Sequence, residues 1–413
     1  MTSAPLAGVR VLDLSRILAA PLTAQLLGDL GAEVIKVERP GSGDDSRSYG
    51  PPFLAGEDGN PTGEAGFYLS ANRNKRSITI DHSTPDGAAL VRTLASRSDV
   101  LVENFRAGVL KKYGLDYGTL HRLHPGLVYC SITGFGQDGP YADRPGYDGI
   151  FQAMSGMMSV SGIPDGEPGA GPMKVGVSMV DIVTGLYAGN AIMAALRHRE
   201  VAGGSGQHID LSLLDCGVAA LSHYAQNYLV SGVPAPRRGN GGFGGIPSQT
   251  FVCADGIEVF LVASTPRQWE AVAKVIGRPE LAYDERFATV SARIAHRELV
   301  LKTLDEAFSS RPASDWISEL ESADVPISPV NDLDGVFANP QVRHRRLRTT
   351  VDHPVSGRVD LLRNPIRLSE TPIEGYRAPP TLGQHTHEVL TDVLGLGSDE
   401  IARLERAGAI TSG

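Results

Sequence analysis

Asp181 is a candidate catalytic residue because it lies at the start of a predicted helix. It follows Ser178 by three residues, and an apolar-periodic segment that predicts a helix over residues 179–199 begins there. The Ser-x-x-Asp spacing is that of a capping box, in which the acid serves the helix terminus. A helix N-terminus also stabilises an ionised carboxylate, which is the form that a nucleophile needs. The spacing alone therefore allows two compatible roles, helix capping and nucleophilic catalysis.

Glycine-rich segments are the next candidates. Residues 241–245 read Gly-Gly-Phe-Gly-Gly, a composition typical of a flexible linker. Glycines also permit a lid to move and let backbone N–H groups approach an oxyanion. Two Gly-x-Gly-x-x-Gly strings, at 134–139 and 239–244, lack the order of strand, loop and helix that a dinucleotide fingerprint needs. The sequence therefore argues against a bound nicotinamide cofactor.

Other catalytic classes lack their motifs. The sequence has no Walker A string, no His-Glu-x-x-His and no Gly-x-Ser-x-Gly. His385 and His387 are two residues apart, which is wrong for one face of a helix, and the three cysteines have no short spacing. A kinase, a serine hydrolase and a zinc hydrolase thus have no local support, and we expect no bound metal.

The elements that must position these residues alternate between strand and helix. Such alternation predicts an α/β fold whose mostly parallel, Rossmann-like sheet is covered on both faces. Gly31 is placed to end the first helix, since glycine takes the left-handed conformation without steric cost. The expected strands cover residues 9–14, 34–37, 100–103, 127–132 and 209–213, and the expected helices 21–30, 88–94 and 179–199, with a further helix ending near Val230.

The composition changes after this segment. Pro234, Pro236 and the glycines of 239–245 form a flexible connection. Residues 249–253 and 258–262 then alternate around Asp255-Gly256, which predicts a β-hairpin, and much of 267–320 is helical. We therefore predict a large domain from residues 1–225 and 335–413, and a smaller α+β domain from residues 226–334.

Charge and composition restrict the setting. The 413 residues carry a formal net charge of −9, which argues against a nucleic-acid binder. No apolar stretch approaches the expected length of a membrane span, and the N-terminus lacks the sections of a secretory signal. We expect a cytoplasmic protein that binds neither membrane nor nucleic acid. Local clusters of Lys and Arg still leave room for an anionic ligand.

Several longer strings are more specific than any single motif. They are Val-Leu-Asp-Leu-Ser-Arg at 11–16, Leu-Gly-Ala-Glu-Val-Ile-Lys-Val-Glu-Arg-Pro-Gly at 30–41, Asn-Arg-Asn-Lys-Arg-Ser at 72–77, Val-Glu-Asn-Phe-Arg at 102–106, Ser-Ile-Thr-Gly-Phe-Gly-Gln-Asp-Gly-Pro at 131–140, Asp-Ile-Val-Thr-Gly at 181–185 and Leu-Gly-Gln-His-Thr at 382–386. Together and in this order they resemble the family III (CaiB/BaiF) CoA-transferases. Asp44-Asp45-Ser46-Arg47 and residues 221–229 resemble members that use succinyl-CoA and a dicarboxylic acid, such as glutarate or hydroxymethylglutarate.

The resemblance implies an activity and an assembly. Members move CoA from an acyl thioester to a carboxylic acid through an aspartyl anhydride and an aspartyl-CoA thioester, and their nucleophilic aspartate falls on Asp181. They form interlocked homodimers, with the active site between the large and small domains. The resemblance implies no metal or redox cofactor, and it implies acyl-CoA and a carboxylic acid, here a C4 to C6 dicarboxylate, as substrates.

The resemblance also implies binding residues. Arg39, Asn104 and Phe105 stand at CoA-contact positions, and Tyr147 with Asp148 matches a pair near the thioester. Further contacts to CoA or substrate are expected from two basic clusters, from one apolar residue near the first cluster, and from the glycine loop. These residues are Arg73, Arg76, Lys112, Ile80, Gly241, Gly242, Gly244 and Gly245. Phe243 interrupts that loop.

The acid-binding residue is left open between two arginines. Leu18 stands where formyl-CoA transferase carries a glutamine, which argues against oxalate as the acceptor. Arg16 and Arg47 are the candidates for binding the acceptor acid, since a guanidinium pairs bidentately with a carboxylate.

Three other functions remain as alternatives. An α-methylacyl-CoA racemase would need a histidine at position 147, where Tyr147 with its ordinary pKa near 10 is a poor base. A CoA-binding protein without turnover would bind acyl-CoA with no exchange. A nicotinamide oxidoreductase would change the absorbance of NADH.

Overall fold

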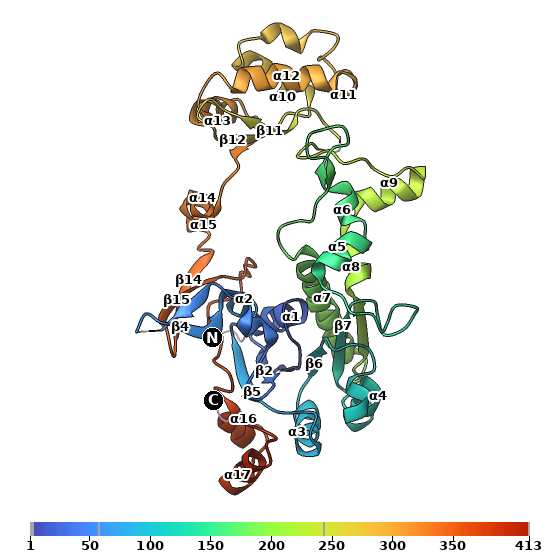
Figure 1. Ribbon diagram of the computed structural model, residues 1–413, viewed down its shortest axis with the longest axis vertical. Coiled ribbons are helices and arrows are strands. Elements are labelled where there is room, and N and C mark those ends of the chain that lie inside the picture. The colour runs from blue at the N-terminus through green and yellow to red at the C-terminus, as the bar shows by residue number, and fades with distance from the viewer. Residues whose placement is uncertain (1–3, 57, 243, 412–413) are drawn as a thin grey trace. The chain divides into compact units, whose positions relative to one another are not determined.

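The chain folds into two compact units (Figure 1). The computed structural model describes residues 4–56, 58–242 and 244–411. The large unit is built from residues 1–158, 174–233 and 345–413, and the small unit from residues 159–173 and 234–344. The sequence-based limits of the small domain, 226 and 334, differ from these. Helix α9 (His223–Ser231) stays with the large unit, whereas residues 159–173 and helix α15 (Pro340–His344) belong to the small one.

A parallel sheet of six strands forms the centre of the large unit. Its spatial order is β10-β7-β6-β1-β2-β5, and every neighbouring pair is parallel. Numbered along the chain, these strands have the order 3-2-1-4-5-6 of a doubly wound fold, which confirms the predicted mostly parallel sheet. The strands are β1 (Arg10–Asp13), β2 (Glu33–Glu38), β5 (Lys75–Thr79), β6 (Val100–Glu103), β7 (Val128–Thr133) and β10 (His208–Ser212).

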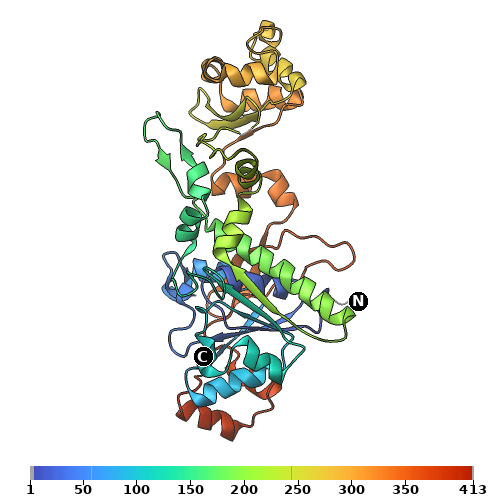
Figure 2. The same cartoon turned by 90° about the vertical axis from the view of Figure 1, so that its right-hand side faces the viewer.

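Helices cover both faces of this sheet. Figure 2 shows the long helix α7 (Met179–Val201) lying across one face, with α3 (Pro85–Ala95) and the C-terminal helices on the other. On the α7 side, Ala188 and Ile192 pack with α1 (Ala19–Asp29) and strand valines such as Val100. On the opposite side, α3, α16 (Thr386–Asp392) and α17 (Ser398–Arg406) pack on the strands. Parallel strands need this double cover because both of their faces are apolar.

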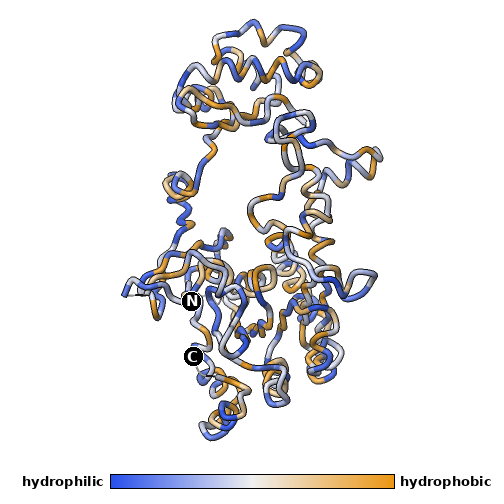
Figure 3. Tube along the Cα trace, viewed as in Figure 1, coloured by the Kyte–Doolittle hydropathy of each residue, from blue (hydrophilic) through white to orange (hydrophobic). Residues whose placement is uncertain are grey.

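Helix α7 corrects one statement made from the sequence. It is long and apolar enough, with a mean hydropathy of 1.5, to cross a membrane by length and composition alone. Figure 3 shows the hydropathy of each residue along the chain, with apolar residues spread over both units. However, Val180, Ala188, Ile192 and Ala195 are buried in the large unit. The structure therefore packs one side of α7 in the core of the large unit, while Leu186 and Met193 on the helix are exposed, and the sequence does contain an apolar stretch of spanning length.

Strand β5 was not predicted, because Lys75 and Arg76 open it. The structure buries Lys75, the first residue of β5, and its Nζ lies 2.8 Å from Oδ2 of Asp13, the last residue of β1, and 2.9 Å from the carbonyl oxygen of Pro21. Lys36 on β2 is equally buried and lies 2.8 Å from Asp44. Buried charges of this kind persist only when they are paired and hydrogen-bonded. These pairs fix the strand ends that carry the loops of the site.

The rest of the large unit consists of short elements around the sheet. The predicted helix ending near Val230 is in fact two helices, because Ser222 adopts a left-handed φ of 47° between them. The remaining elements are η1 (Asp45–Ser48), β3 (Phe53–Ala55), β4 (Pro61–Ala65), α2 (Gly66–Ser70), η2 (Leu110–Tyr113), α4 (Tyr117–Leu123), α5 (Asp148–Met154), α8 (Leu213–Ala220), β14 (Arg348–His353) and β15 (Gly357–Leu362), and α6 (Met157–Val160) crosses into the small unit.

The small unit has an antiparallel sheet and its own core. The strand order is β11-β12-β13, and the predicted hairpin of β11 with β12 is confirmed. Trp269, Phe308 and Trp316 are among the side chains buried there. The elements are β8 (Gly162–Ile163), β9 (Gly171–Pro172), β11 (Ser248–Val252), β12 (Glu258–Val262), α10 (Pro266–Val275), η3 (Pro279–Ala282), α11 (Val290–Ala295), α12 (Arg297–Phe308), α13 (Ala313–Ser322), β13 (Ile327–Pro329), α14 (Leu333–Ala338) and α15.

Candidate active site

A cavity of about 280 Å³ lies at the carboxyl ends of the central strands. The loops after β1 and β6 form part of its wall, and the chain changes direction across the sheet between these two strands. Ligands of open α/β sheets collect at such a switch point. The lining residues are Arg16, Ile17, Leu18, Ala19, Asn104, Phe105, Arg106, Ile132, Thr133, Gly134, Ala142, Arg144, Pro145, Gly146, Tyr147, Asp148, Phe151, Asp181 and Leu213.

The cavity brings together six residues that the sequence had selected. Asp181, Tyr147, Asp148, Asn104, Phe105 and Arg16 all line it. Tyr147 is 67% exposed and is the residue before α5, whereas Asp148 is the first residue of that helix. Residues that are far apart in the sequence therefore meet at one end of the sheet.

Asp148 performs the capping role that the spacing had suggested for Ser178. Its Oδ1 accepts hydrogen bonds from the backbone N–H of Val180 at 2.8 Å and of Asp181 at 3.3 Å. Its Oδ2 accepts from Gln152 Nε2 at 2.7 Å. Ser178 makes no side-chain capping bond, so the predicted capping box does not form. Asp148 thus satisfies N–H groups that the start of α7 would otherwise leave open.

The Asp181 carboxyl group has no hydrogen-bond or ion-pair partner in the described part of the chain. Among the residues that the structure describes, no side chain donates a hydrogen bond to it or forms an ion pair with it. Burial, and then the negative charge of Asp148, raise the pKa of Asp181 to about 7. The net shift of the Asp181 pKa is therefore toward the neutral form. A carboxylate that is poorly stabilised and faces a cavity is a stronger nucleophile than one in ion pairs.

The β1 and β6 loops hold each other at the wall of the cavity. The backbone N–H of Arg16 donates to Asn104 Oδ1 at 2.9 Å, and Asn104 Nδ2 donates to the Arg16 carbonyl at 2.7 Å. The Arg16 guanidinium lies 5.5 Å from the centre of the Phe105 ring and 2.9 Å from Asp45. Ile17 has a φ of 74°, which is strained for a β-branched residue, and Asp44 accepts its N–H at 3.0 Å.

A second cavity, of about 230 Å³, shares Arg16 and Phe105 with the first. Arg39, His82 and Tyr113 also line it. Burial lowers the pKa of His82, and its ring meets those of Phe105 and Tyr113 edge-on at 5.3 Å. Arg39 is exposed, so the cavity combines aromatic edges with a cation. Such a surface suits a nucleotide with phosphate groups.

Three predicted arginines have other partners in the structure. Arg47 is buried, bonded to both Glu38 and Glu64, and its guanidinium lies 3.8 Å from the Tyr68 ring centre. Arg73 pairs with Asp29 in the core, and Arg76 pairs with Glu33 and Glu388. None of the three lines either cavity. They stabilise the fold, and this corrects their assignment as substrate contacts.

Two further predicted contacts lie outside both cavities. Ile80 is fully buried in the core and bridges to Ile410, so its side chain is occupied by packing. Lys112 is exposed, and its Nζ lies 4.8 Å from the centre of the Tyr113 ring. Because Tyr113 lines the second cavity, Lys112 is close to that cavity's edge.

The glycine loop lies in the small unit and is packed there. A Cβ atom added at Gly241 would come within 2.3 Å of Arg297 Nη2, and one at Gly245 within 2.1 Å of Ser264 Oγ. An added Cβ at Gly242 would lie 2.5 Å from Ser248 Oγ, whereas Gly244 faces open space. Close packing therefore selects glycine at three of these four positions. Phe243 lies outside the described residues.

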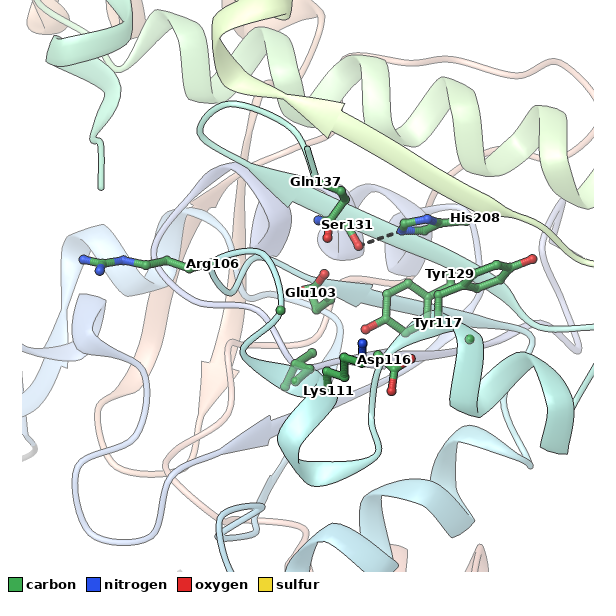
Figure 4. Close-up of a pocket in the computed structure, with 12 residues that line it drawn as sticks. Glu103, Arg106, Lys111, Asp116, Tyr117, Tyr129, Ser131, Gln137 and His208 are labelled. Carbon is green, nitrogen blue, oxygen red and sulfur yellow. Dashed lines mark hydrogen bonds between the residues drawn. The ribbon is translucent and has the colours of Figure 1, made fainter. Parts of the chain in front are cut away.

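Sequence reasoning missed a third cavity, of about 210 Å³, and two arginines. Figure 4 shows Glu103, Ser131 and His208 converging there from β6, β7 and β10, with Ser131 Oγ 2.9 Å from His208 Nε2. Burial raises the pKa of Glu103 to about 7. Arg106 and Arg144 line the first cavity. Arg106 follows soon after the end of β6 at Glu103, so strand prediction could have indicated it. The described residues contain no cluster of His, Cys, Asp or Glu arranged to hold a metal ion.

Comparison with known proteins places this chain in a class of transferases that act on CoA thioesters. The sequence model of the family described as "CoA-transferase family III" matches residues 6–386. The chain is 44% identical over 389 residues to the succinate–glutarate CoA-transferase of Agrobacterium fabrum, covering 94% of this chain and 96% of that relative. It is 41% identical over 406 residues to the human succinyl-CoA:glutarate CoA-transferase, covering 98% and 90% of the two chains.

A solved structure supports the same assignment. The crystal structure of a CaiB/BaiF family protein from Brucella suis superposes with a TM-score of 0.85 at 42% identity, covering 95% of this chain and all of that one. The chain belongs to CoA-transferase family III and is an enzyme of that family. The resemblance described from the sequence is confirmed.

Proposed function

We propose that this CoA-transferase moves CoA from succinyl-CoA to glutarate or a similar C4 to C6 dicarboxylate, with Asp181 as the nucleophile. One observation carries the proposal: the Asp181 carboxyl group faces the cavity at the sheet's switch point without a hydrogen-bond or ion-pair partner among the described residues. The names of the two relatives that are 44% and 41% identical supply the substrate class.

The chemistry proceeds in four exchanges. An Asp181 carboxylate oxygen attacks the succinyl thioester carbonyl, which forms a mixed anhydride and expels CoA thiolate. The thiolate attacks the Asp181 acyl carbon, so that succinate leaves and an aspartyl-CoA thioester remains. The acceptor carboxylate attacks this thioester, giving a second anhydride and CoA thiolate. The thiolate then attacks the acceptor's acyl carbon, releasing the new acyl-CoA and the free Asp181 carboxylate. Each step replaces one bond to an acyl carbon by another, so no redox or metal cofactor is needed.

Other residues serve binding in this scheme. Arg39 with Lys112 contacts the CoA phosphates, Asn104 and Phe105 contact the CoA chain, and Tyr147 lies beside the thioester. The support is that Arg39 and Phe105 line the second cavity, while Asn104, Phe105 and Tyr147 line the first. Loss of CoA affinity in Arg39→Ala, measured by calorimetry, tests the phosphate contact.

The assembly that we propose is an interlocked homodimer in the cytoplasm. Its support is the apolar surface of α9, which has no buried residue and exposes Leu229 and Val230 at 74% and 79%. Three buried, unpaired cysteines agree with a reducing compartment. Sedimentation velocity would contradict the dimer by showing one monomeric species, and cell fractionation would contradict the location by recovering the protein with membranes.

Intact-mass spectrometry with succinyl-CoA alone tests the nucleophile. The unsubstituted protein should gain the mass of CoA less one water through the aspartyl thioester, and Asp181→Asn should not. Asp143→Asn, which removes an exposed carboxylate from the loop before Tyr147, is the matched control and should still gain it. An adduct on Asp181→Asn would refute the assignment. With glutarate present, glutaryl-CoA should appear only when Asp181 is intact.

A further inference from the structure

The proposed reaction brings two dicarboxylates to the same carboxyl group. The succinyl group of the donor and the acceptor acid each use one carboxyl function at Asp181, and each carries a second carboxylate that does not react. Because both form an anhydride with the same aspartate, the spare carboxylates approach the same part of the cavity. A guanidinium is the side chain that recognises a carboxylate bidentately. The inference that follows rests on the proposed function and concerns which guanidinium does this.

Three arginines line the cavity that contains Asp181. Arg16 is paired with Asp45 at 2.9 Å, and its guanidinium lies on the Phe105 ring. Arg106 and Arg144 form no ion pair with any residue that the structure describes. Figure 4 shows the Arg106 side chain directed away from the other labelled residues of the third cavity. Two guanidinium groups are therefore available to a carboxylate at the Asp181 cavity.

Aromatic rings hold Arg144 in place. Its guanidinium carbon lies 3.8 Å from the centre of the Tyr141 ring, and its backbone N–H donates to the Tyr141 carbonyl at 2.9 Å. Tyr141 meets Phe135 edge-on at 5.6 Å, and Phe135 meets Phe151 at 5.2 Å. Phe151 is only 1% exposed and belongs to α5, whose first residue is Asp148. Rings from the core to the cavity wall thus fix one face of the guanidinium.

The stacking leaves the edge of the guanidinium for a ligand. The N–H groups of arginine lie in the guanidinium plane, so a ring on its face does not compete for them. Holding the side chain before binding also reduces the entropy lost when a carboxylate is bound. Arg106 has no ring contact of this kind among the described residues. Arg144 is therefore the better prepared of the two.

We propose that Arg144 is the specificity-determining residue that pairs with the non-reacting carboxylate of both the acyl donor and the acceptor. Arg144 is preferred to the two candidates taken from the sequence, because Arg47 is buried between Glu38 and Glu64 and Arg16 is paired with Asp45, whereas Arg144 has no protein carboxylate partner among the described residues. One guanidinium then serves both halves of the reaction. The enzyme should prefer a spare carboxylate in both the donor and the acceptor. A substitution of Arg144 should weaken both preferences.

The test compares glutarate with its monoamide, glutaramate, which has the same length but no charge at its far end. With succinyl-CoA as donor, Arg144→Gln should lower kcat/KM for glutarate about 10- to 100-fold, the range for a lost hydrogen bond to a charged group. For glutaramate the change should be less than about threefold, since no spare charge is lost. Equal losses for both acceptors, or no loss for glutarate, would overturn the proposal.

Two controls separate this proposal from its neighbours. Arg106→Gln should leave the ratio of glutarate to glutaramate unchanged, and a selective loss in that variant would assign the role to Arg106 instead. Tyr141→Phe keeps the ring and should keep the preference, while Tyr141→Ala should lose part of it. Failure of the unmodified enzyme to transfer CoA to any dicarboxylate would refute the proposed function itself, a result distinct from a failure of Arg144→Gln alone.

Discussion

Replacing Asp148 by Asn should move the pH dependence of the enzyme to lower pH. Burial is the larger cause and the Asp148 charge the smaller cause that raises the pKa of Asp181 from an ordinary 3.8 to about 7. Only the ionised carboxylate attacks the thioester, so kcat/KM for succinyl-CoA should fall about tenfold per pH unit below 7. Removing the Asp148 charge should lower the pKa of Asp181. The reactive carboxylate then persists to lower pH, so the pH profile shifts to lower pH.

The size of the change in Asp148→Asn follows from what the variant removes. The asparagine oxygen can still accept the N–H of Val180, so the start of α7 stays capped, but the negative charge is gone. Loss of one nearby like charge changes a carboxyl pKa by about one unit, equal to about 1.4 kcal/mol. The profile should therefore shift down by about one pH unit while burial keeps it above the ordinary carboxyl range.

The assay is the initial rate of CoA transfer at limiting succinyl-CoA from pH 5 to pH 9, with product acyl-CoA separated by chromatography. Because kcat/KM reports on the free enzyme, the midpoint measures Asp181 before the donor binds. A midpoint that does not move in Asp148→Asn, or that moves upward, would refute the role of the Asp148 charge. A flat profile of the unmodified enzyme across pH 5 to 8 would refute the raised pKa itself. Thermal melting of the variant checks that α7 keeps its stability.

Two further predictions concern stability and assembly. Burial raises the pKa of Glu103 from 4.5 to about 7, so the folded unmodified protein holds a proton that the unfolded chain releases, and its unfolding free energy should fall by about 1.4 kcal/mol per pH unit between those values and then level. Glu103→Gln should lack this decline, because Gln does not titrate and its side-chain oxygen still accepts the Phe105 N–H. Unfolding free energies measured by urea denaturation from pH 5 to 8 that change with pH in the same way in both proteins would contradict the prediction. Val230→Glu on the exposed face of α9 should weaken the proposed dimer, and an unchanged sedimentation coefficient at low protein concentration would contradict that interface.

The sheet was predictable wherever burial makes a strand uniformly apolar. Residues 100–103 and 127–132 have that pattern, and both strands are found in the structure. Strand β5 was missed because Lys75 and Arg76 look like surface charges. Lys75 is buried only because Asp13 lies opposite it, 62 residues away in the sequence. No local pattern reports a pairing of that kind.

The sequence identified several residues of the candidate site, but it did not identify the hydrogen bonds and ion pairs that these residues form. Asp181 and Asp148 were both selected, but the sequence suggested that Ser178 and Asp181 would cap α7, whereas the structure gives that role to Asp148, 33 residues away. Arg47 looked available for a substrate, yet Glu38 and Glu64 fold around it. A guanidinium is free or occupied according to tertiary contacts, which residue type and spacing do not encode.

The two ends of the chain complete one core, and this has a consequence during synthesis. Val389, Leu390, Ile401 and Ile410 pack with strand residues from the first half of the chain, such as Leu12, and residues 80 and 410 form a bridge. While the C-terminal segment is still inside the ribosome, the face of the parallel sheet that α3 covers lacks the further cover of α16 and α17, and the exposed apolar surface favours aggregation of nascent chains. A message cut short before the codon for Thr386 would therefore yield a protein that retains every residue of the candidate site but leaves part of this face uncovered, and such a product would become a substrate for chaperones and proteases.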